Sequence, residues 1–530
     1  NKPVYSEAEG SASESNKRSP LQEKGKVMYT IGIDIGTTNC KVCLFEIPSL
    51  ELINQYSFRT PKIVDGEDTD FDVRLIWDGV LHGLRTITNI LDNAGKISAV
   101  AVASVGEAGV LLDDNDNVIG PVLTWYDTRP KQQLENIISA MDIEHIYEIT
   151  GIPAHSNYSI NKIKWLKDNI SNASEGRKWL CLAEYIAFKL SGVKRSEYSL
   201  ASRTMALNIA ELNWDEQLIN AAELSPSLFS PLVQAGEAIG TVTSGVSELT
   251  GLTTNTRVAI AGHDHMCGSV AVGLTSEDQI LNSTGTTEGL LVVTEAVNNT
   301  GRFFRARVSN GVHVLPGLHS LYASLPSAGY AIEWFRNLFE LDMPAFLRMV
   351  DTLRNEQDMA MAGALDGVFI PHLRGSGPPD RNTWSRALIY GLDDKSRPED
   401  ILRFVFQGLC FELRNLLDLY ETLTGKDYPV VNVIGAACKN PYWLQLKANI
   451  LNREILACNV NEAVSKGAAM LAAKAAGVEV ECLPGTNGEQ TCRYLPEIDA
   501  VAHYQAIYTQ VYKPLYESKM RTERLCNGVN

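Results

Sequence analysis

The sequence predicts an α/β protein made of two domains. Its 530 residues suggest two large domains or three smaller ones, at roughly 100–200 residues per domain. Residues 28–105 are predicted to form two strands, a helix and a further strand, an order typical of α/β architecture. A strand, a Gly/Thr turn and a second strand recur at 278–294, which we interpret as a weak internal repeat. We therefore expect a first domain at 28–272 and a second at 273–525, dividing near Gly273.

The first domain is expected to open with a β-hairpin. Residues 29–34 and 41–47 are rich in β-forming side chains and flank a turn that contains Gly36. The acidic segment 65–72 is expected to be a loop. Apolar residues then recur at helical spacing over 73–93, and 97–105 is typical of a buried strand. The pattern further predicts mostly helix over 130–192, and a turn and a strand over 253–261.

The second domain is expected to continue this alternation. From residue 367 the pattern predicts a strand, a loop rich in Gly and Pro, a long helix over 398–425, another strand and two more helices. Residues 1–27, in contrast, are polar and contain no apolar segment of the kind that a secretory signal requires. We expect them to form a disordered tail.

The acidic composition narrows the choice of partners. Asp and Glu number 63 and Lys and Arg number 47, which gives a net charge of −16. This charge argues against a nucleic acid or an anionic membrane surface as a partner, because both attract a basic face. No apolar run approaches the ~20 residues that span a bilayer. A local anion site built from backbone N–H groups is still compatible with an acidic chain.

The ten cysteines are scattered, and two of them, Cys40 and Cys43, form a CxxC pattern. Because positions i and i+3 of a strand face opposite sides, the two sulfurs should diverge rather than share a disulfide or a zinc ion. Free thiols are typical of a reducing compartment, so we expect a cytoplasmic protein.

The opening turn, within Asp34-Ile35-Gly36-Thr37-Thr38, is suited to bind phosphate. Gly36 permits a tight turn and the close approach of a phosphate. Thr37 and Thr38 offer hydroxyl and backbone N–H donors. Asp34 stands at a strand end, where a carboxylate can hold Mg²⁺ directly or through water. Gly-Thr-Thr alone would also fit a plain hairpin, but the full pattern between two β runs is more specific.

Two later segments extend this interpretation. The turn Ser283-Thr284-Gly285-Thr286-Thr287 repeats the phosphate-binding chemistry, so that two facing turns would clamp one nucleotide between the domains. The small-residue turn Gly435-Ala436-Ala437 precedes a predicted helix over 442–451 and would let a flat adenine lie against the backbone. Taken alone, each segment would be an ordinary turn.

The segment Ala261-Gly262-His263-Asp264-His265 contains a candidate general base. An Asp that follows a buried strand can accept a proton from a substrate hydroxyl. The alternative is an Asp that only caps the following helix. A metal site formed by the two histidines is a further alternative, for which no distant ligand stands out.

Taken together and in this order, these segments resemble the FGGY carbohydrate kinases, the family of glycerol, xylulose, gluconate and fuculose kinases. The resemblance extends from about Met28 to Glu517. Further segments are similar to motifs of that family: Trp125-Tyr126-Asp127-Thr128-Arg129, Ser199-Leu200-Ala201-Ser202-Arg203-Thr204, Ala328–Trp334, Phe369–Leu373 with Arg386–Leu392, and Gly467–Ala473. The resemblance implies an actin-like, ribonuclease H-like ATPase fold with a cleft between its two domains.

The resemblance also implies roles for individual residues. Asp264 would be the catalytic base, and Glu107 and His263 would contact the substrate, with Glu107 at the place of the family's sugar-contacting loop. Asp34 would hold Mg²⁺. The residues expected to bind ATP are Thr37, Thr38, Gly285 and Thr286 at the phosphates, and Gly329, Ala436 and Asn440 along the rest of the nucleotide.

The chain departs from the family pattern at two positions. The family usually has Gly-Gly-Ala where this chain has Gly435-Ala436-Ala437, and Ala-Asp-Ile where it has Ala448-Asn449-Ile450. The added methyl group of Ala436 would weaken or shift nucleotide binding, but neither change touches Asp264. The order Gly-His-Asp at 262–264 is closer to the fuculose and rhamnulose kinases than to the glycerol kinases, which favours a keto-sugar.

We therefore expect an enzyme that uses ATP and Mg²⁺ to phosphorylate a hydroxyl of a small sugar, keto-sugar or polyol. Two alternatives stay open: an actin-like ATPase whose nucleotide drives binding of a protein partner, and a non-catalytic sugar-binding regulator. The loop 104–109, Asp264 and the insert 130–215 argue against the first, whereas Ala436 leaves room for the second. The sequence does not identify the sugar, and a homodimer is one arrangement that it leaves open.

Overall fold

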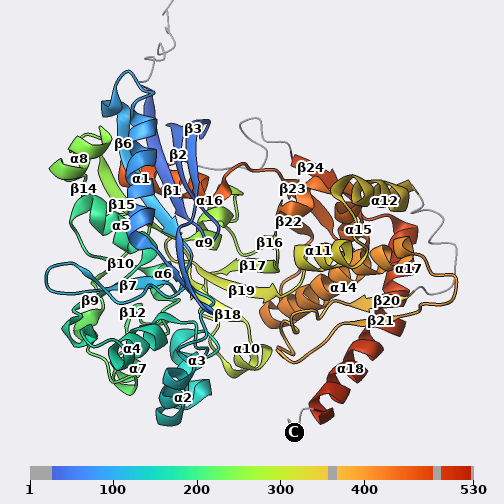
Figure 1. The fold of residues 1–530 in the computed structure, drawn as a ribbon. Helices are drawn as coiled ribbons and strands as arrows, with labels where there is room; N and C mark the ends of the chain where they lie inside the picture. Colours follow the sequence, from blue (N-terminus) through green and yellow to red (C-terminus); the bar gives the residue numbers. More distant parts are fainter. Residues whose placement is uncertain (1–26, 356–366, 481–490, 527–530) are drawn as a thin grey trace, which may run out of the picture.

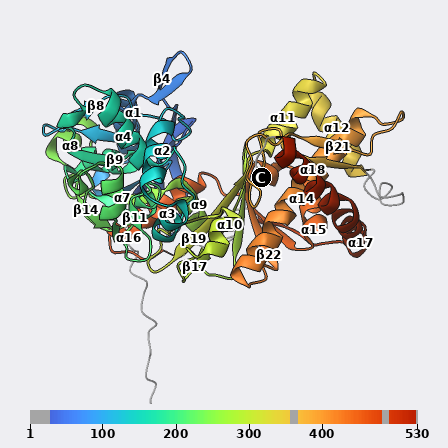
Figure 2. The same ribbon diagram turned by 90° about the horizontal axis from the view of Figure 1, so that it is seen from below.

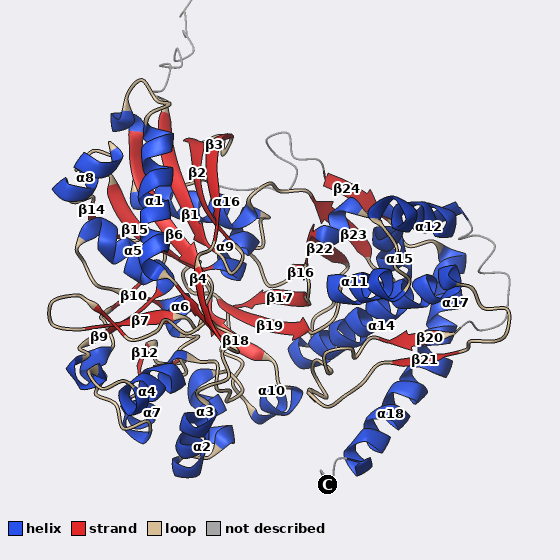
Figure 3. Ribbon diagram, in the orientation of Figure 1, coloured by secondary structure: helices blue, strands red, loops and turns tan. Residues whose placement is uncertain are grey.

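Two large β-sheets organise the chain, and helices cover both of them (Figures 1 and 3). The structure is a computed structural model that describes residues 27–355, 367–480 and 491–526. The tail expected at 1–27 lies, apart from Val27, outside the described residues.

The first sheet has six strands in the order β14-β15-β6-β1-β2-β3. As expected, β1 and β2 form an antiparallel hairpin, and β1 is parallel to β6, which is parallel to β15. The carboxyl ends of β1, β6 and β15 therefore meet at one edge of the sheet, where α/β proteins commonly bind ligands. The strands are β1 (Met28–Ile35), β2 (Asn39–Ile47), β3 (Leu52–Arg59), β6 (Ile97–Ser104), β14 (Ala238–Thr241) and β15 (Arg257–His263).

Alternation of side-chain size along β6 determines how helices pack on this sheet. Val100 and Val102 point to one face and pack in the same cluster as α1 (Val73–Thr88) and α5 (Leu182–Ser191). The intervening alanines point to the other face, where they pack with α9 (Asp264–Ala271) and α16 (Ala463–Ala475). Small side chains on that face allow helices to approach the sheet closely.

Helix α16 lies directly against β1, although it belongs to the second half of the sequence (Figure 1). A Cβ atom added at Gly32 would lie 1.8 Å from the backbone oxygen of Ser465. The hydroxyl of Thr30 also donates to the backbone oxygen of Ala469 at 3.0 Å. The division near Gly273 stays a prediction, and α16 is the segment of 273–525 that packs with the first sheet.

An insert between β6 and β15 adds a separate apolar core. It contains a three-stranded sheet in the order β8-β7-β9, two short strand pairs, and the helices that the sequence predicts over 130–192. Its elements are β7 (Gly109–Leu112), β8 (Val118–Ile119), α2 (Lys131–Ala140), α3 (Ile143–Thr150), α4 (Ser159–Asn169), β9 (Lys178–Cys181), β10 (Ser196–Glu197), α6 (Tyr198–Ala201), β11 (Leu207–Asn208), β12 (Asn213–Trp214), α7 (Glu216–Ala221) and β13 (Leu232–Val233). Helix α8 (Ser244–Thr250) lies between β14 and β15 in the sequence.

The second sheet has seven strands in the order β18-β19-β17-β16-β22-β23-β24. Its β16–β17 hairpin is antiparallel and β16 is parallel to β22, which repeats the pairing of β1 with β2 and β6. The internal repeat is therefore present in the topology. The strands are β16 (Ile280–Thr284), β17 (Glu288–Thr294), β18 (Ser309–Val312), β19 (His319–Leu325), β22 (Val430–Gly435), β23 (Glu454–Cys458) and β24 (Thr491–Tyr494).

Helices and one small strand pair complete this half of the molecule, which lies beside the first half in Figure 2. The predicted long helix is α14 (Pro398–Thr424), which is mostly buried in the larger apolar core. The other elements are α10 (Gly301–Ala306), α11 (Gly329–Leu338), α12 (Met343–Asn355), β20 (Val368–Ile370), β21 (Leu388–Tyr390), α15 (Pro441–Leu451), α17 (Ile498–Ile507) and α18 (Lys513–Cys526).

Two local predictions need correction and one is confirmed. The segment 65–72 is not simply a loop, because β4 (Lys62–Asp65) and β5 (Asp68–Phe71) pair as a hairpin. The helix predicted over 73–93 ends at Thr88. Cys40 and Cys43 do face opposite sides of β2, since they pack in different clusters, Cys43 against Ala469. Within the described ranges, no helix is long and apolar enough to cross a membrane.

Candidate active site

Three segments meet where β1, β6 and β15 end. The turn that contains Thr37 follows β1, the loop that contains Glu107 follows β6, and Asp264 follows β15. In the paired register Ile35 lies opposite Ser104, and Ser104 lies opposite His263. Residues that are far apart in the sequence are therefore neighbours at this edge.

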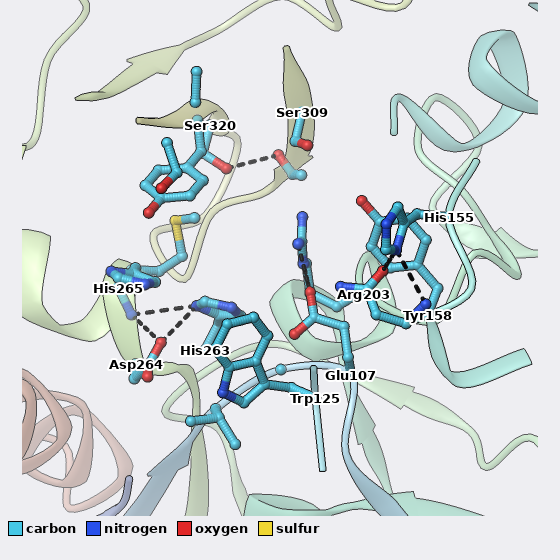
Figure 4. A pocket seen from close by; sticks show the side chains of 18 of the residues that line it. Glu107, Trp125, His155, Tyr158, Arg203, His263, Asp264, His265, Ser309 and Ser320 are labelled. Carbon is cyan, nitrogen blue, oxygen red and sulfur yellow. Dashed lines mark hydrogen bonds and ion pairs between the residues drawn. The ribbon is translucent and has the colours of Figure 1, made fainter. Parts of the chain in front are cut away.

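A cavity of about 370 Å³ opens beside these three segments (Figure 4). We call it the Glu107 cavity. One wall comes from the first half of the chain, and the other comes from β18, β19 and a loop near residue 380. Its polar lining includes Glu107, His155, Asn157, Arg203, His263, Asp264, Ser309, Asn310, Tyr322 and Arg381.

Glu107 forms a buried ion pair with Arg203. The carboxylate, which is 5% exposed, accepts from Nε of Arg203 at 2.7 Å and also contacts its terminal nitrogen. The backbone of Glu107 is in the left-handed region, with φ 63°, and its carbonyl oxygen accepts from Nζ of Lys162 at 3.0 Å. These contacts fix the position of the Glu107 carboxylate in the lining of the cavity.

Asp264 is the first residue of α9 and points into the same cavity (Figure 4). Its Oδ1 accepts from the backbone N–H of His265 at 2.6 Å and lies 3.0 Å from Nδ1 of His263. Burial acts to raise the pKa of this carboxyl group, but the neighbouring His265 and His263 and these hydrogen bonds together hold it below its ordinary value. Asp264 is therefore a carboxylate at neutral pH.

A buried hydrogen-bond chain supports the backbone beside Asp264. The backbone N–H of His263 donates to Oγ of Ser199 at 2.9 Å, and Oγ of Ser199 donates to Glu197 at 2.5 Å. Gly262 has φ 109°, and a Cβ there would lie 2.4 Å from Oγ of Ser199. A glycine is therefore required at position 262 for this close approach. Burial raises the pKa of Glu197, at the end of this chain, to about 7.

A second cavity, of about 530 Å³, is lined by residues in and beside strands of both sheets. We call it the Asp34 cavity. Its lining includes Asp34, Lys41, Thr284, Gly285, Gly435, Ala436, Lys439 and Glu462. A smaller space of about 180 Å³, lined by Asp264 and by Ala463 and Val464, shares residues with both cavities.

Asp34 is buried with one oxygen, Oδ1, that has no hydrogen-bond partner among the described residues. Burial and the charge of Asp264 raise the pKa of its carboxyl group to about 7. Lys41 acts in the opposite direction and is itself paired with Glu462 at 2.5 Å. An unpaired carboxylate oxygen beside a second carboxylate is suited to bind a cation.

The turns of the second sheet approach the Asp34 cavity. Gly285 and Ala436 line it, and a Cβ added at Gly435, which has φ 90°, would lie 2.0 Å from the backbone oxygen of Thr284. The N–H of Gly329 donates to the backbone oxygen of Gly285 at 3.0 Å, so α11 begins against this turn.

The other residues that the sequence assigns to the nucleotide do not line the Asp34 cavity. Thr37 lines the Glu107 cavity and its hydroxyl accepts from Nε1 of Trp125 at 3.0 Å. Thr38 and Thr286 are exposed at their turns. The side chain of Asn440 caps α15 by accepting from the N–H of Trp443 at 3.1 Å.

Sequence reasoning assigned no role to several residues that line the Glu107 cavity. Arg203 stands within the segment 199–204 that the resemblance singled out, which was an available signal. Tyr322 stacks on His265 with ring centroids 5.1 Å apart, and no local motif marks it. The same holds for Arg307 and Arg381, which come from the second half of the chain.

Two mixed sheets with repeated hairpins, flanked by helices, are typical of the actin-like ATPase fold. Residues 29–271 match the model described as "FGGY family of carbohydrate kinases, N-terminal domain", and residues 280–476 match the corresponding C-terminal domain. The chain therefore belongs to the FGGY family of carbohydrate kinases, enzymes that transfer a phosphoryl group to an alcohol.

Comparisons over the whole chain agree with this family. A xylulose kinase of Bacillus subtilis is 27% identical over 505 residues, which cover 92% of this chain and 96% of the relative. A gluconokinase of the same organism is 25% identical and covers 90% and 94% of the two chains. The fold is similar to that of a xylulose kinase from Rhodospirillum rubrum, with TM-score 0.82, 20% identity and 93% and 99% coverage. A Plasmodium falciparum glycerol kinase with ADP has TM-score 0.80, 17% identity and 92% and 98% coverage.

Proposed function

We propose that this kinase transfers the terminal phosphoryl group of ATP to a hydroxyl of a small sugar, keto-sugar or polyol, with Asp264 as the general base. The observation that carries the proposal is the position of Asp264. It lines the Glu107 cavity and also acts electrostatically on Asp34, which lines the other cavity. A base at such a junction could contact an acceptor hydroxyl on one side and face the nucleotide phosphates on the other.

The acceptor would occupy the Glu107 cavity. Glu107, Asn157, Ser309 and Asn310 offer the mixed donors and acceptors that hydroxyl groups require. Trp125 and Tyr322 supply apolar surface for the carbon chain. The names of the relatives, which include xylulose, gluconate and glycerol kinases, support an acceptor of this size and chemistry.

The nucleotide would occupy the Asp34 cavity, with its phosphates at the turn that contains Gly285 and its terminal phosphate directed toward Thr37, which lines the Glu107 cavity. Backbone N–H groups and Lys41 would compensate the phosphate charge. This arrangement also explains how an acidic protein can bind a polyanion, because the donors are local and do not depend on net charge.

Mg²⁺ fits the residues beside Asp34. Asp34 has an unpartnered oxygen and stands next to Asp264. In the described ranges no cluster of three or more His, Cys, Asp and Glu could hold a metal ion by itself. That agrees with Mg²⁺, which proteins usually bind through one or two carboxylates, with substrate phosphates and water as the other ligands. When bound, the ion would neutralise phosphate charge.

The protein's own contribution would be mainly to position the reactants. Asp264, held ionised by the neighbouring histidines, would accept a hydrogen bond from the acceptor hydroxyl and take its proton as the new O–P bond forms. The bond from the transferred phosphorus to the bridging oxygen of ATP would break in the same step, and ADP would leave with that oxygen. Glu107 and Arg203 would hold the rest of the acceptor in place. Enclosure between the two halves would keep out water, which otherwise competes as an acceptor.

The test is a coupled ADP-release screen over polyols, ketoses, aldoses and sugar acids, with Asp264→Asn as the matched control. We expect ADP release that depends on one class of acceptor and is lost in the variant. If the folded protein binds ATP but releases ADP at the same rate with and without every acceptor, the proposal is wrong.

A further inference from the structure

Two arginines in the Glu107 cavity have no ionic partner among the residues that the structure describes. The Lys, Arg, Asp and Glu residues that line the cavity are three arginines and two carboxylates. Arg203 is paired with Glu107, and Asp264 is bonded to its neighbouring histidine. Arg307 and Arg381 remain, and no carboxylate of the described part of the chain lies within ion-pair distance of either.

This excess of positive charge runs against the composition of the chain. Acidic residues exceed basic ones by 63 to 47, so an average surface patch should be acidic. A concave site that collects unpaired charge of the opposite sign focuses the electric field and attracts a ligand of complementary charge. Guanidinium groups are well suited to this role, because their planar donors match the two oxygens of a carboxylate.

Both arginines stand on backbone that is held in place. Arg307 follows α10 in the left-handed region with φ 55°, and its N–H donates to the backbone oxygen of Phe304 at 3.0 Å. Arg381 lies in a loop that is closed by Ser376, whose hydroxyl donates to the backbone oxygen of Asp380 at 2.6 Å. Helix α18 also contacts this loop, because Arg524 of the helix forms an ion pair with Asp380 at 2.5 Å.

The arginines mark the part of the cavity away from the base. Arg381 acts electrostatically on His155, and Figure 4 shows His155 and Asp264 on opposite sides of the cavity. Ser309, two positions after Arg307, also lies apart from Asp264 in Figure 4. A ligand that spans this space would have a hydroxyl group at one end and a negative charge at the other.

We infer that the acceptor is a sugar acid, a polyhydroxylated chain whose carboxylate binds Arg307 and Arg381 while a hydroxyl at its other end reaches Asp264. This inference rests on the proposed function and narrows its substrate class. Two arginines and the ionised Asp264 leave a single excess positive charge, which matches a carboxylate better than a doubly charged phosphate. Neutral polyols and ketoses would bind the same cavity more weakly.

The experiment compares acids with neutral compounds of the same carbon skeleton. ADP release would be measured with D-erythronate, D-xylonate and D-gluconate, with erythritol, xylitol and D-glucitol, with D-xylulose, and with D-ribose 5-phosphate. The variants are Arg307→Gln and Arg381→Gln. Arg305→Gln is the matched control, because Arg305 is exposed, lies two positions from Arg307 and does not line the cavity.

We expect at least one acid to exceed its neutral counterpart in kcat/KM. Each cavity variant should lower kcat/KM for that acid by about ten- to hundredfold, the range for one lost hydrogen bond to a charged group. The loss should lie mainly in KM for the acid, with a smaller loss on the neutral counterpart and with the KM for ATP unchanged. Arg305→Gln should behave as the wild type.

Preference for a neutral compound or for the sugar phosphate would overturn the inference and leave the proposed function standing. If no compound is phosphorylated, titration calorimetry of the three acids against the wild type and both variants decides separately. Binding that the variants lose would support the inference although the proposed function fails. Absence of acid binding, or binding that the variants keep, would overturn it.

Discussion

Replacing Asp264 by Asn is the most direct perturbation of the proposed chemistry. The substitution removes the negative charge and the ability to take a proton, and it changes the shape very little. An amide oxygen can still accept from the backbone N–H of His265, which Oδ1 contacts at 2.6 Å. Asn is also a good residue for a helix N-terminus. The Asp264→Asn variant should therefore fold and bind ATP nearly as the wild type does.

The expected loss follows from the state of the carboxyl group. Its pKa lies below the ordinary value, so at pH 7 the wild type presents a carboxylate in almost every molecule. General-base catalysis is typically worth about 10²–10⁴ in rate. At 1.36 kcal/mol for each factor of ten, this corresponds to about 3–5 kcal/mol in the barrier. The loss should appear in kcat, with KM for ATP kept within about threefold.

The assay is coupled ADP release with the acceptor that the screen identifies, together with calorimetric titration of ATP and thermal unfolding of each variant. His265→Asn is a useful companion, since it changes the neighbour that contributes most to keeping Asp264 ionised. If Asp264→Asn retains near-wild-type turnover, Asp264 serves only the start of α9, and the proposed mechanism fails.

Three further predictions test the surroundings of the site. Burial and the charge of Asp264 raise the pKa of Asp34 in the folded protein to about 7 from the ordinary value of 3.8. The folded state therefore holds this proton more tightly than the unfolded state does. The contribution of Asp34 to the free energy of unfolding is fully present below pH 3.8 and is lost as the pH rises through 7. Without nucleotide, Asp34→Asn should therefore raise Tm more at pH 8 than at pH 5, and an equal change in Tm at both pH values would contradict this pH dependence. The same variant should raise the Mg²⁺ concentration needed for activity more than Asp264→Asn does. Ser199→Ala leaves the buried N–H of His263 without its acceptor, which should cost about 1–3 kcal/mol in urea unfolding and lower kcat several-fold; a silent variant would show that the buried chain supports nothing. Gly32→Ala places a Cβ 1.8 Å from Ser465 and should cost about 3 kcal/mol or more, whereas unchanged stability would mean that α16 does not pack on β1 as described.

Local patterns predicted the parts of the fold that depend on local geometry. The hairpins β1–β2 and β16–β17 each require a Gly/Thr turn between two β runs, and both are formed. The position of Asp264 just after a buried strand was also predicted, and β15 ends at His263, two residues later than the predicted strand. A strand end fixes which residue reaches the sheet edge, so such a prediction needs no knowledge of distant segments.

The rest of the site depends on contacts that no local pattern contains. Glu107 and Arg203 are 96 positions apart, and their pairing depends on how the insert folds back over β6. Helix α16 has an Ala-rich sequence that would fit either sheet. Its place is decided by the alanine face of the first sheet and by Gly32, which lies more than 400 positions earlier. Arg307 and Arg381 enter the cavity only once the two halves are assembled.

The electrostatics of the two strand-end carboxylates give an assignment of roles that does not depend on family resemblance. Asp34 and Asp264 end parallel strands of one sheet and repel each other, and their surroundings shift the two pKa values in opposite directions. Histidines beside Asp264 favour its charged form, whereas burial of Asp34 favours its neutral form. Two titratable groups whose pKa values are shifted apart in this way usually have different roles in a catalytic site. This separation supports the proposal that Asp264 accepts the proton, and it predicts that a cation beside Asp34 would shift that carboxyl group further toward its ionised form.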